Sequence, residues 1–214
     1  MEEVLNEDNR RFGADLKIIT IGDVSTGKTS ILRRYINNTF DENTQATIMP
    51  DFSYKVVKIN GANYRIQFWD LPGQDRNPVI TSVFCQDANG VIFCCDANDN
   101  KSRQNIINWK NSLNNMIDSE KIPKILLENK CDLLGKDKYN EGFEELKQFA
   151  NDNKINECYR TSALDGHNVE KAITFLINEI VKNFDEKDLK SIDDLATSKV
   201  KVSKNTNHNK QRCC

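Results

Sequence analysis

The sequence of 214 residues lacks a long hydrophobic run, an excess of charge, and any cysteine–histidine cluster at zinc spacing. Its longest apolar run, Val91–Cys95, is far shorter than the ~20 residues of a membrane-spanning helix. Because 30 basic residues face 32 acidic ones, binding to nucleic acid through a general positive charge is not expected. The acidic start and the absence of glycine at position 2 argue against a secretory signal and N-myristoylation.

The cysteines do not form the pattern of a disulfide framework. There are 7, an odd number, and their spacing is irregular, which favours a reducing compartment. Cys94 and Cys95 lie in an apolar run and are expected to be buried thiols of the core. Cys213 and Cys214 differ, because they end a polar tail that has no core to join.

Short apolar runs alternate with amphipathic segments along most of the chain. Apolar side chains at helical spacing predict helices over 106–117, 143–150 and 169–180. Strands are predicted over Leu16–Ile21, Phe52–Ile59, Tyr64–Trp69, Val91–Asp96, Lys124–Leu127 and Glu157–Thr161. This alternation is typical of an α/β fold with a mostly parallel sheet and helices on both faces.

The length fits one domain with polar ends. Residues 1–14 are expected to be a flexible arm, 15–183 the domain, and 184–214 a solvated tail whose last part is basic. Asn60-Gly61 separates two strand candidates and predicts a hairpin, hence one antiparallel edge strand. We therefore expect six strands and about five flanking helices.

Residues 22–29 (GDVSTGKT) fit the phosphate-binding pattern G-x-x-x-x-G-K-[ST] between a predicted strand and a predicted helix. Backbone N–H groups there would face a polyanion, Lys28 would contact the β- and γ-phosphates, and the Thr29 hydroxyl would bind Mg²⁺. The pattern alone indicates a nucleoside triphosphate without naming its base. The candidate phosphate-binding residues are Asp23, Val24, Ser25, Thr26, Gly27, Lys28, Thr29 and Ser30.

A second motif, Asn129-Lys130-Cys131-Asp132, follows a predicted buried strand. The Asp132 carboxylate can accept two hydrogen bonds from guanine, whereas adenine would leave it unpaired. Polar sites of this kind reach discriminations on the order of 10⁴. Asn129 is expected to tie this loop to the phosphate loop, and the Lys130 stem to cover the purine. Ser162, Ala163 and Leu164 form a further candidate base-contacting loop, with the Ala163 N–H facing the guanine oxygen.

With these motifs in order, residues 14–183 resemble the small GTPases, and most of all the Rabs. Residues 69–75 (WDLPGQD) resemble W-D-T-A-G-Q-E, and 47–52 (TIMPDF) resemble T-I-G-V-D-F. Residues 81–84 (TSVF) resemble the end of the second Rab switch, and 122–132 are faintly similar to the Rab branch of lysosome-related organelles. The resemblance implies a P-loop G domain.

The resemblance also implies residue roles. Thr29, Thr47 and Asp70 would hold Mg²⁺, and the Gly73 N–H would touch the γ-phosphate. Gln74 would be the catalytic residue that orients the attacking water. Phe40 would pack on the guanine.

The effector surface implied by the resemblance comprises Ile48–Phe52, Trp69 and Phe84. For the aromatic residues among them, plain core packing is the alternative. The implied activity is a switch that binds GTP or GDP with Mg²⁺, hydrolyses GTP slowly and recruits effectors in vesicle traffic. An exchange factor and an activating protein would be its regulators.

The C-terminal Cys213-Cys214 resembles the double geranylgeranylation signal of Rabs. Two isoprenoid chains satisfy the two-signal rule for stable anchoring, and the basic residues before them favour an anionic leaflet. We therefore expect a chain that is lipid-anchored on the cytoplasmic face of an intracellular membrane. It would cycle through the cytosol with a chaperone that extracts the prenyl groups.

Several residues depart from the family pattern. Val24 replaces a smaller residue near the γ-phosphate, Pro72 precedes Gly73 in place of alanine, and Met49-Pro50 replaces Gly-Val. Glu128 stands where glycine is common, Leu164 stands where a supporting lysine is common, and Asn77-Pro78 would break a helix early in the second switch. These departures leave open a nucleotide-locked adaptor that hydrolyses poorly. An ATP-dependent kinase is disfavoured by Asp132.

Overall fold

The computed structural model describes residues 12–74, 78–135, 139–140 and 142–183. The predicted tail over 184–214 and most of the predicted arm lie outside these ranges. Within them, no helix is both long and apolar enough to cross a membrane. The elements in chain order are β1 (Phe12–Ile21), α1 (Lys28–Asn37), β2 (Asp51–Ile59), β3 (Ala62–Asp70), α2 (Pro78–Cys85), β4 (Gly90–Asp96), α3 (Asn100–Met116), β5 (Lys124–Asn129), η2 (Cys131–Leu133), α4 (Phe143–Asp152), β6 (Glu157–Arg160) and α5 (Val169–Asn183).

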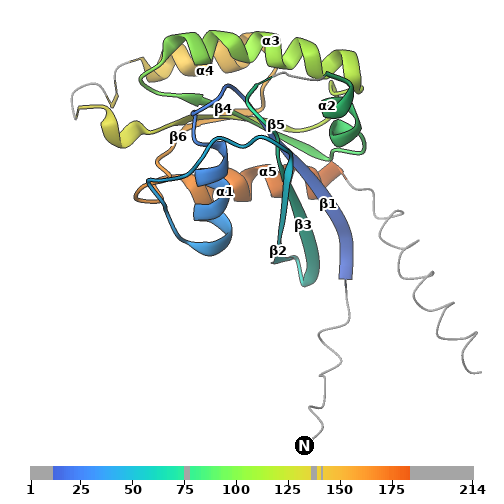
Figure 1. The fold of residues 1–214 in the computed structure, drawn as a ribbon. Coiled ribbons are helices and arrows are strands. Elements are labelled where there is room, and N and C mark those ends of the chain that lie inside the picture. The colour runs from blue at the N-terminus through green and yellow to red at the C-terminus, as the bar shows by residue number, and fades with distance from the viewer. Residues whose placement is uncertain (1–11, 75–77, 136–138, 141, 184–214) are drawn as a thin grey trace, which may run out of the picture.

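These strands form one sheet in the order β2-β3-β1-β4-β5-β6. All neighbours are parallel except β2 and β3, which form the predicted antiparallel hairpin at one edge. Helices α3 and α4 cover one face of the sheet, and α1 and α5 cover the other (Figure 1). The predicted α/β class, the six-stranded mixed sheet and the five α-helices are thereby confirmed.

The central strands are apolar throughout because both of their faces are covered. In β5, Ile125 and Leu127 join the core under α1 and α5, whereas Leu126 between them joins the core under α3 and α4. The same alternation divides β4, where Cys94 faces the first core and Cys95 the second. The expectation that these two thiols are buried is correct.

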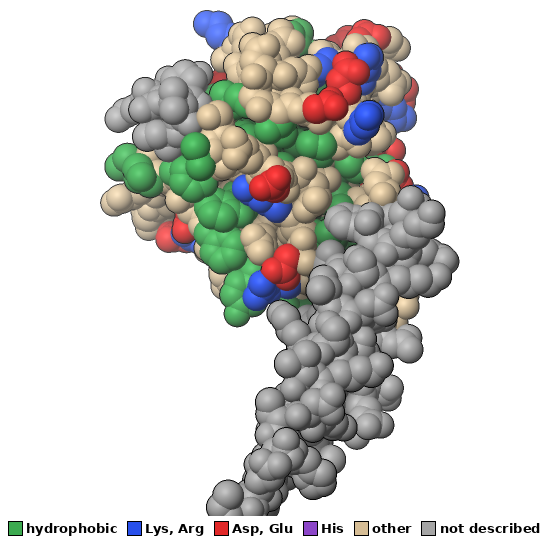
Figure 2. All heavy atoms as spheres, turned by 90° about the vertical axis from the view of Figure 1, so that its right-hand side faces the viewer, with side chains coloured by type: hydrophobic (Ala, Val, Ile, Leu, Met, Phe, Trp, Pro, Cys, Tyr) green, Lys and Arg blue, Asp and Glu red, His purple; other side chains and the backbone are tan. Residues whose placement is uncertain are grey.

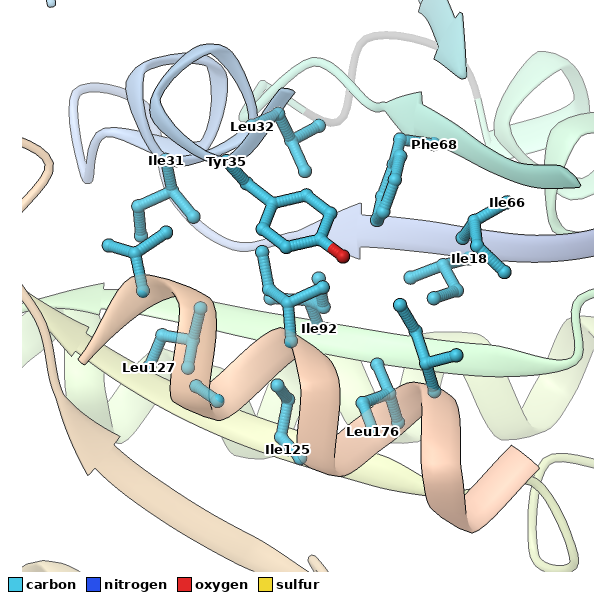
Figure 3. Close-up of a cluster of buried hydrophobic side chains, with 14 of the residues drawn as sticks. Ile18, Ile31, Leu32, Tyr35, Ile66, Phe68, Ile92, Ile125, Leu127 and Leu176 are labelled. Carbon is cyan, nitrogen blue, oxygen red and sulfur yellow. The ribbon is translucent and has the colours of Figure 1, made fainter. Parts of the chain in front are cut away.

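The core beneath α1 is organised around two aromatic rings. Tyr35 from α1 and Phe68 from β3 meet edge to face, with 5.4 Å between ring centroids. Isoleucine and leucine side chains from the sheet and from α5 surround them (Figure 3). This packing fixes α1, and with it the loop that precedes α1, against the sheet.

One boundary differs from the sequence predictions. Strand β1 begins at Phe12 and not at Leu16, so residues 12–14 belong to the sheet and not to the arm. Backbone pairing of Phe12 with Asn63 extends the strand beyond its apolar part, across an irregularity in register. Helix α2 begins at Pro78, a position where the missing N–H of proline costs nothing. Asn77 lies outside the described residues, so the expected helix break at Asn77-Pro78 stays a prediction.

Replacing Phe68 with alanine should lower the free energy of unfolding by about 3–5 kcal/mol, because it leaves a cavity against Tyr35 in a close-packed core. Urea denaturation measures the change. Val56→Thr is the matched control, since Val56 is exposed on edge strand β2 and threonine keeps the β-branch. That control should change stability by less than about 0.5 kcal/mol. Equal losses in the two variants would contradict this description of the core.

The thiols of Cys85, Cys94, Cys95, Cys131 and Cys158 are free and buried. Burial raises the pKa of Cys94 to about 11 and that of Cys158 to about 12. Because the thiolate is the reactive form, roughly one Cys94 thiol in a thousand would be ionised at pH 8.

We therefore expect iodoacetamide at pH 8 to leave these thiols largely unmodified in the native chain. Urea should expose them and restore an ordinary pKa of about 8.5, so that all of them react. The experiment uses the Cys213→Ser/Cys214→Ser variant, so that the tail thiols do not add to the number of modified cysteines. Mass spectrometry measures that number. A native thiol that reacts as fast as the unfolded one would refute the prediction for that position.

Candidate nucleotide-binding site

The predicted phosphate loop connects β1 to α1 and depends on glycine at two places. Gly22 has φ +148°, and a Cβ there would lie 2.1 Å from the backbone oxygen of Cys94. Gly27 has φ +90°, and a Cβ there would lie 2.3 Å from the Asn129 amide nitrogen. The loop can approach β4 and the base motif this closely only without side chains at these positions.

Lys28, the first residue of α1, folds back over the loop. Its Nζ donates hydrogen bonds to the backbone oxygens of Gly22 at 2.9 Å and Asp23 at 2.8 Å. Burial lowers the pKa of Lys28, against the opposing effects of Cys94, Asp70 and Asp23. The ammonium group is therefore held near the loop by weak carbonyl acceptors, which a phosphate can replace.

Three oxygen-bearing side chains meet beside this loop. The Thr29 hydroxyl donates to Asp70 Oδ2 and lies 2.8 Å from the Thr47 hydroxyl, which itself lies 3.2 Å from the same carboxylate oxygen. Burial raises the pKa of Asp70, although Thr29, Lys28 and Thr47 act in the opposite direction. Its other oxygen, Oδ1, is buried and has no hydrogen-bond partner among the described residues. Hydroxyl and carboxylate oxygens with a spare buried acceptor fit Mg²⁺, which prefers hard ligands.

The base motif is joined to the phosphate loop through Asn129, as the sequence predicted. Asn129 Nδ2 donates to the Thr26 carbonyl at 2.9 Å, while its Oδ1 accepts from the Ala163 N–H at 3.2 Å. The Thr161 hydroxyl lies 3.5 Å from the same oxygen, and the Cys131 N–H donates to the Thr161 carbonyl. One buried side chain therefore holds all three loops together.

Lys130 and Asp132 border the same cleft. Lys130 has φ +63°, and its Nζ lies 2.7 Å from Asp96 Oδ2 at the end of β4. Asp132 is exposed and lines the cleft, so its carboxylate is accessible from the cleft.

The loop at Ala163 has a support that the sequence analysis missed. Arg34 in α1 donates from Nε to the Ala163 carbonyl at 2.9 Å and from Nη2 to the Leu164 carbonyl at 2.6 Å. Arg34 therefore holds the loop in which Leu164 takes the place of the lysine common in the family. Nothing local in the sequence links α1 to a loop more than a hundred positions away.

The cleft formed by these loops has a volume of about 420 Å³. Predicted residues that line it are Val24, Ser25, Gly27, Lys28, Thr29, Ser30, Phe40, Thr47, Gly73, Asn129, Lys130, Asp132, Ala163 and Leu164. Residues that line it but were not predicted are Asp41, Glu42, Thr44, Gln45, Ala46 and Leu133. Most of these lie between Phe40 and Thr47 in the sequence. Because both of those residues were predicted site residues, the segment that connects them could have been predicted to line the cleft.

Some predicted residues do not line the cleft. Thr26 and Ser162 are buried behind it. The Asp23 carboxylate is turned away and accepts from Trp109 Nε1 at 2.7 Å and from Asn105 Nδ2 at 2.9 Å, both in α3. Asp23 therefore anchors the phosphate loop to α3.

Gly73 packs on the phosphate loop at Val24. A Cβ at Gly73 would lie 2.4 Å from the Val24 backbone nitrogen, so only glycine allows this approach. Val24 remains exposed at the rim of the cleft. Gln74 is exposed and immediately follows Gly73, at the end of a described segment.

The aromatic side chains named as an effector surface form a continuous row. Ring centroids are 5.1 Å apart between Phe52 and Trp69, and 5.3 Å apart between Trp69 and Phe84. Phe52 is 46% exposed, and Ile48 and Met49 beside it are 76% and 65% exposed. Figure 2 shows hydrophobic side chains gathered on this side of the molecule. Phe52 is therefore not simply a core residue, because nearly half of it is exposed. Trp69 and Phe84 are partly buried and pack against the core.

The sequence matches the Ras family over residues 17–182. It is 35% identical to the Ras-related protein Rab-32A of Dictyostelium discoideum over 172 residues, which cover 78% of each chain. It is 31% identical to Rab-32 of Homo sapiens over 204 residues, 92% of this chain and 88% of the human one. It is 33% identical to RABA5c of Arabidopsis thaliana over 214 residues, 98% of each chain. The chain therefore belongs to the Ras family of small GTPases, as a divergent member of the Rab group.

Proposed function

We propose that this GTPase is a slow, membrane-anchored Rab switch that uses Mg²⁺ and recruits effectors while GTP is bound. The observation that carries the proposal is the convergence of Thr29, Thr47 and Asp70 on one point. These residues come from α1, from the segment before β2 and from the end of β3. A metal held there joins the phosphate loop to the segment before β2, so that segment senses the bound phosphates.

Different residues around the cleft bind the phosphates, the base and the metal. Lys28 exchanges its carbonyl acceptors for phosphate oxygens, and backbone N–H groups at the start of α1 face the polyanion. Asp132 accepts from the guanine, and Phe40 packs on the base. Thr29, Thr47 and Asp70 would hold Mg²⁺, which would supply neutralisation of the phosphate charge.

Hydrolysis depends on the residues that follow β3. Gly73 packs closely on the phosphate loop, which supports a contact of its N–H with the γ-phosphate, and Gln74 orients the attacking water there. The exposed position of Gln74 favours slow hydrolysis, because positioning must be completed by an activating protein.

Effectors dock on the surface formed by Ile48–Phe52, Trp69 and Phe84. Its exposed apolar side chains adjoin the residues that sense the γ-phosphate, so occupancy of the cleft controls the shape of this surface. An exchange factor, an activating protein and a prenyl-extraction chaperone complete the cycle. Prenylation of Cys213 and Cys214 anchors the chain to the cytoplasmic face of a membrane in vesicle traffic.

A nucleotide-locked adaptor is the second candidate, and Val24 is the observation that favours it. Its branched side chain is exposed at the rim of the cleft, and its backbone packs closely against Gly73, the neighbour of Gln74. An exposed valine there competes for the space that the attacking water needs.

Single-turnover hydrolysis of γ-labelled GTP separates the two candidates. We expect the wild-type chain to release phosphate slowly, and Gln74→Leu to reduce that rate by about 10²-fold, since it removes the group that positions the water. Val24→Gly should raise the rate, roughly tenfold, because it removes a branched side chain from the rim of the cleft and frees space for the attacking water.

Nucleotide affinity is the control in these assays, and it should stay within about twofold in Gln74→Leu because Gln74 lies outside the cleft lining. A wild-type chain that binds GTP but releases no more phosphate than Gln74→Leu supports the adaptor instead. Preference for ATP over GTP in a competition assay would remove both candidates.

A further inference from the structure

Glu128 and Arg160 form a buried ion pair at the ends of two neighbouring strands. They are the last residues paired across β5 and β6, in direct register. Arg160 Nε donates to Glu128 Oε2 at 2.7 Å, and the two side chains are only 7% and 4% exposed. Both lie on the face of the sheet that α3 and α4 cover.

Two further groups extend the pair into a network. Arg103 in α3 places its Nη1 3.5 Å from the other carboxylate oxygen of Glu128. Arg160 Nη1 donates to the backbone oxygen of Tyr139, in the chain that leads from the base motif towards α4. Glu128 therefore has cations on both of its oxygens, and Arg160 reaches past it to the next loop.

The network lies directly beneath the two loops that would contact guanine. Glu128 immediately precedes Asn129, and Arg160 immediately precedes Thr161. The backbone continues the connection, because the Thr161 N–H donates to the Glu128 carbonyl at 2.9 Å. Successive residues of a strand point to opposite faces, so Glu128 holds the strand ends from one face while Asn129 holds the loops from the other.

A buried charged pair is seldom the most stabilising choice for folding. Removing two charges from water is costly, and apolar residues of similar volume are often equally or more stabilising. A charged hydrogen bond at 2.7 Å is, however, short and directional, which apolar contact is not. The distinctive contribution of this pair is thus to fix the position of the end of β5 relative to the end of β6.

We propose that the Glu128–Arg160 pair, with Arg103, is a positioning device that sets the spacing of the two guanine-contacting loops and prolongs the residence of the bound nucleotide. The inference rests on the proposed guanine site. It assigns a purpose to Glu128, which stands where the family commonly has glycine. The pair acts through Asn129 and Ala163 and does not touch the nucleotide.

The test replaces both charges by apolar residues in the full-length chain, as Glu128→Leu/Arg160→Leu. Two quantities are measured: the dissociation rate of a fluorescent GDP analogue and the midpoint of thermal unfolding without added nucleotide. We expect dissociation to become about tenfold faster, or about 1.4 kcal/mol of lost binding. The thermal midpoint should stay at or above that of the wild type.

Lys124→Met is the matched control. Lys124 is also a buried cation on β5, but at the opposite end of the strand, where its Nζ donates to the carbonyls of Ile122 and Glu120. This variant should lower the thermal midpoint and leave the dissociation rate within about twofold of wild type. If the Glu128–Arg160 pair served folding alone, GDP dissociation would become faster only in a variant whose thermal midpoint falls. That result in the double variant and in Lys124→Met would overturn the proposal.

Arg160→Lys keeps the test decisive if the double variant does not fold. Lysine retains the charge beside Glu128 but lacks the planar fork that also reaches Tyr139. A folded Arg160→Lys should release GDP about threefold faster, between the wild type and the apolar pair. Release at the wild-type rate from either folded variant refutes the positioning role. A wild-type chain that binds no guanine nucleotide refutes instead the proposed function.

Discussion

The side-chain amide of Asn129 is the interaction on which the whole site depends. It donates to the carbonyl of Thr26 in the phosphate loop and accepts from the Ala163 N–H, so loops after β1, β5 and β6 share one buried group. Parallel strands make this possible, because their carboxyl ends all emerge at the same edge of the sheet. Gly27 completes the arrangement, since any Cβ there would displace the amide. The phosphate loop and the two candidate base-contacting loops are therefore parts of one rigid unit.

Support for this unit comes from helices on both faces of the sheet. On one face, Arg34 of α1 binds the carbonyls of Ala163 and Leu164, and the packing of Tyr35 on Phe68 keeps α1 in place. On the other face, α3 anchors the phosphate loop through Asp23. The loops are thus fixed in place by helices that pack on the two cores.

The sequence was sufficient to predict the sheet, the hairpin and most of the cleft, because periodicity and short motifs encode them locally. It could not predict Arg34, since hydrogen bonds from a helix to distant carbonyl oxygens leave no local pattern. It named Asp23 among the phosphate-binding residues, but it did not indicate that the Asp23 carboxylate accepts from Trp109 in α3. A phosphate loop works through its backbone, so the motif does not specify where each side chain turns. Strand β1 was predicted too short because backbone pairing continues where the apolar pattern ends.

The site also contains a second, less constrained part, formed by residues 41–50 and 72–74. Most side chains of 41–50 are exposed, in contrast to the buried strand ends around Asn129. Segments with few buried contacts open at low free-energy cost. The hydroxyl of Thr47 connects the first segment to Thr29 and Asp70, and the close approach of Gly73 to Val24 connects the second to the phosphate loop. Under the proposed function, a γ-phosphate would order both segments through Thr47 and Gly73 while the base-binding unit stays unchanged. Affinity for the nucleotide and response to its γ-phosphate would then depend on different residues, so substitutions such as Val24 and Pro72 would alter hydrolysis without loss of binding.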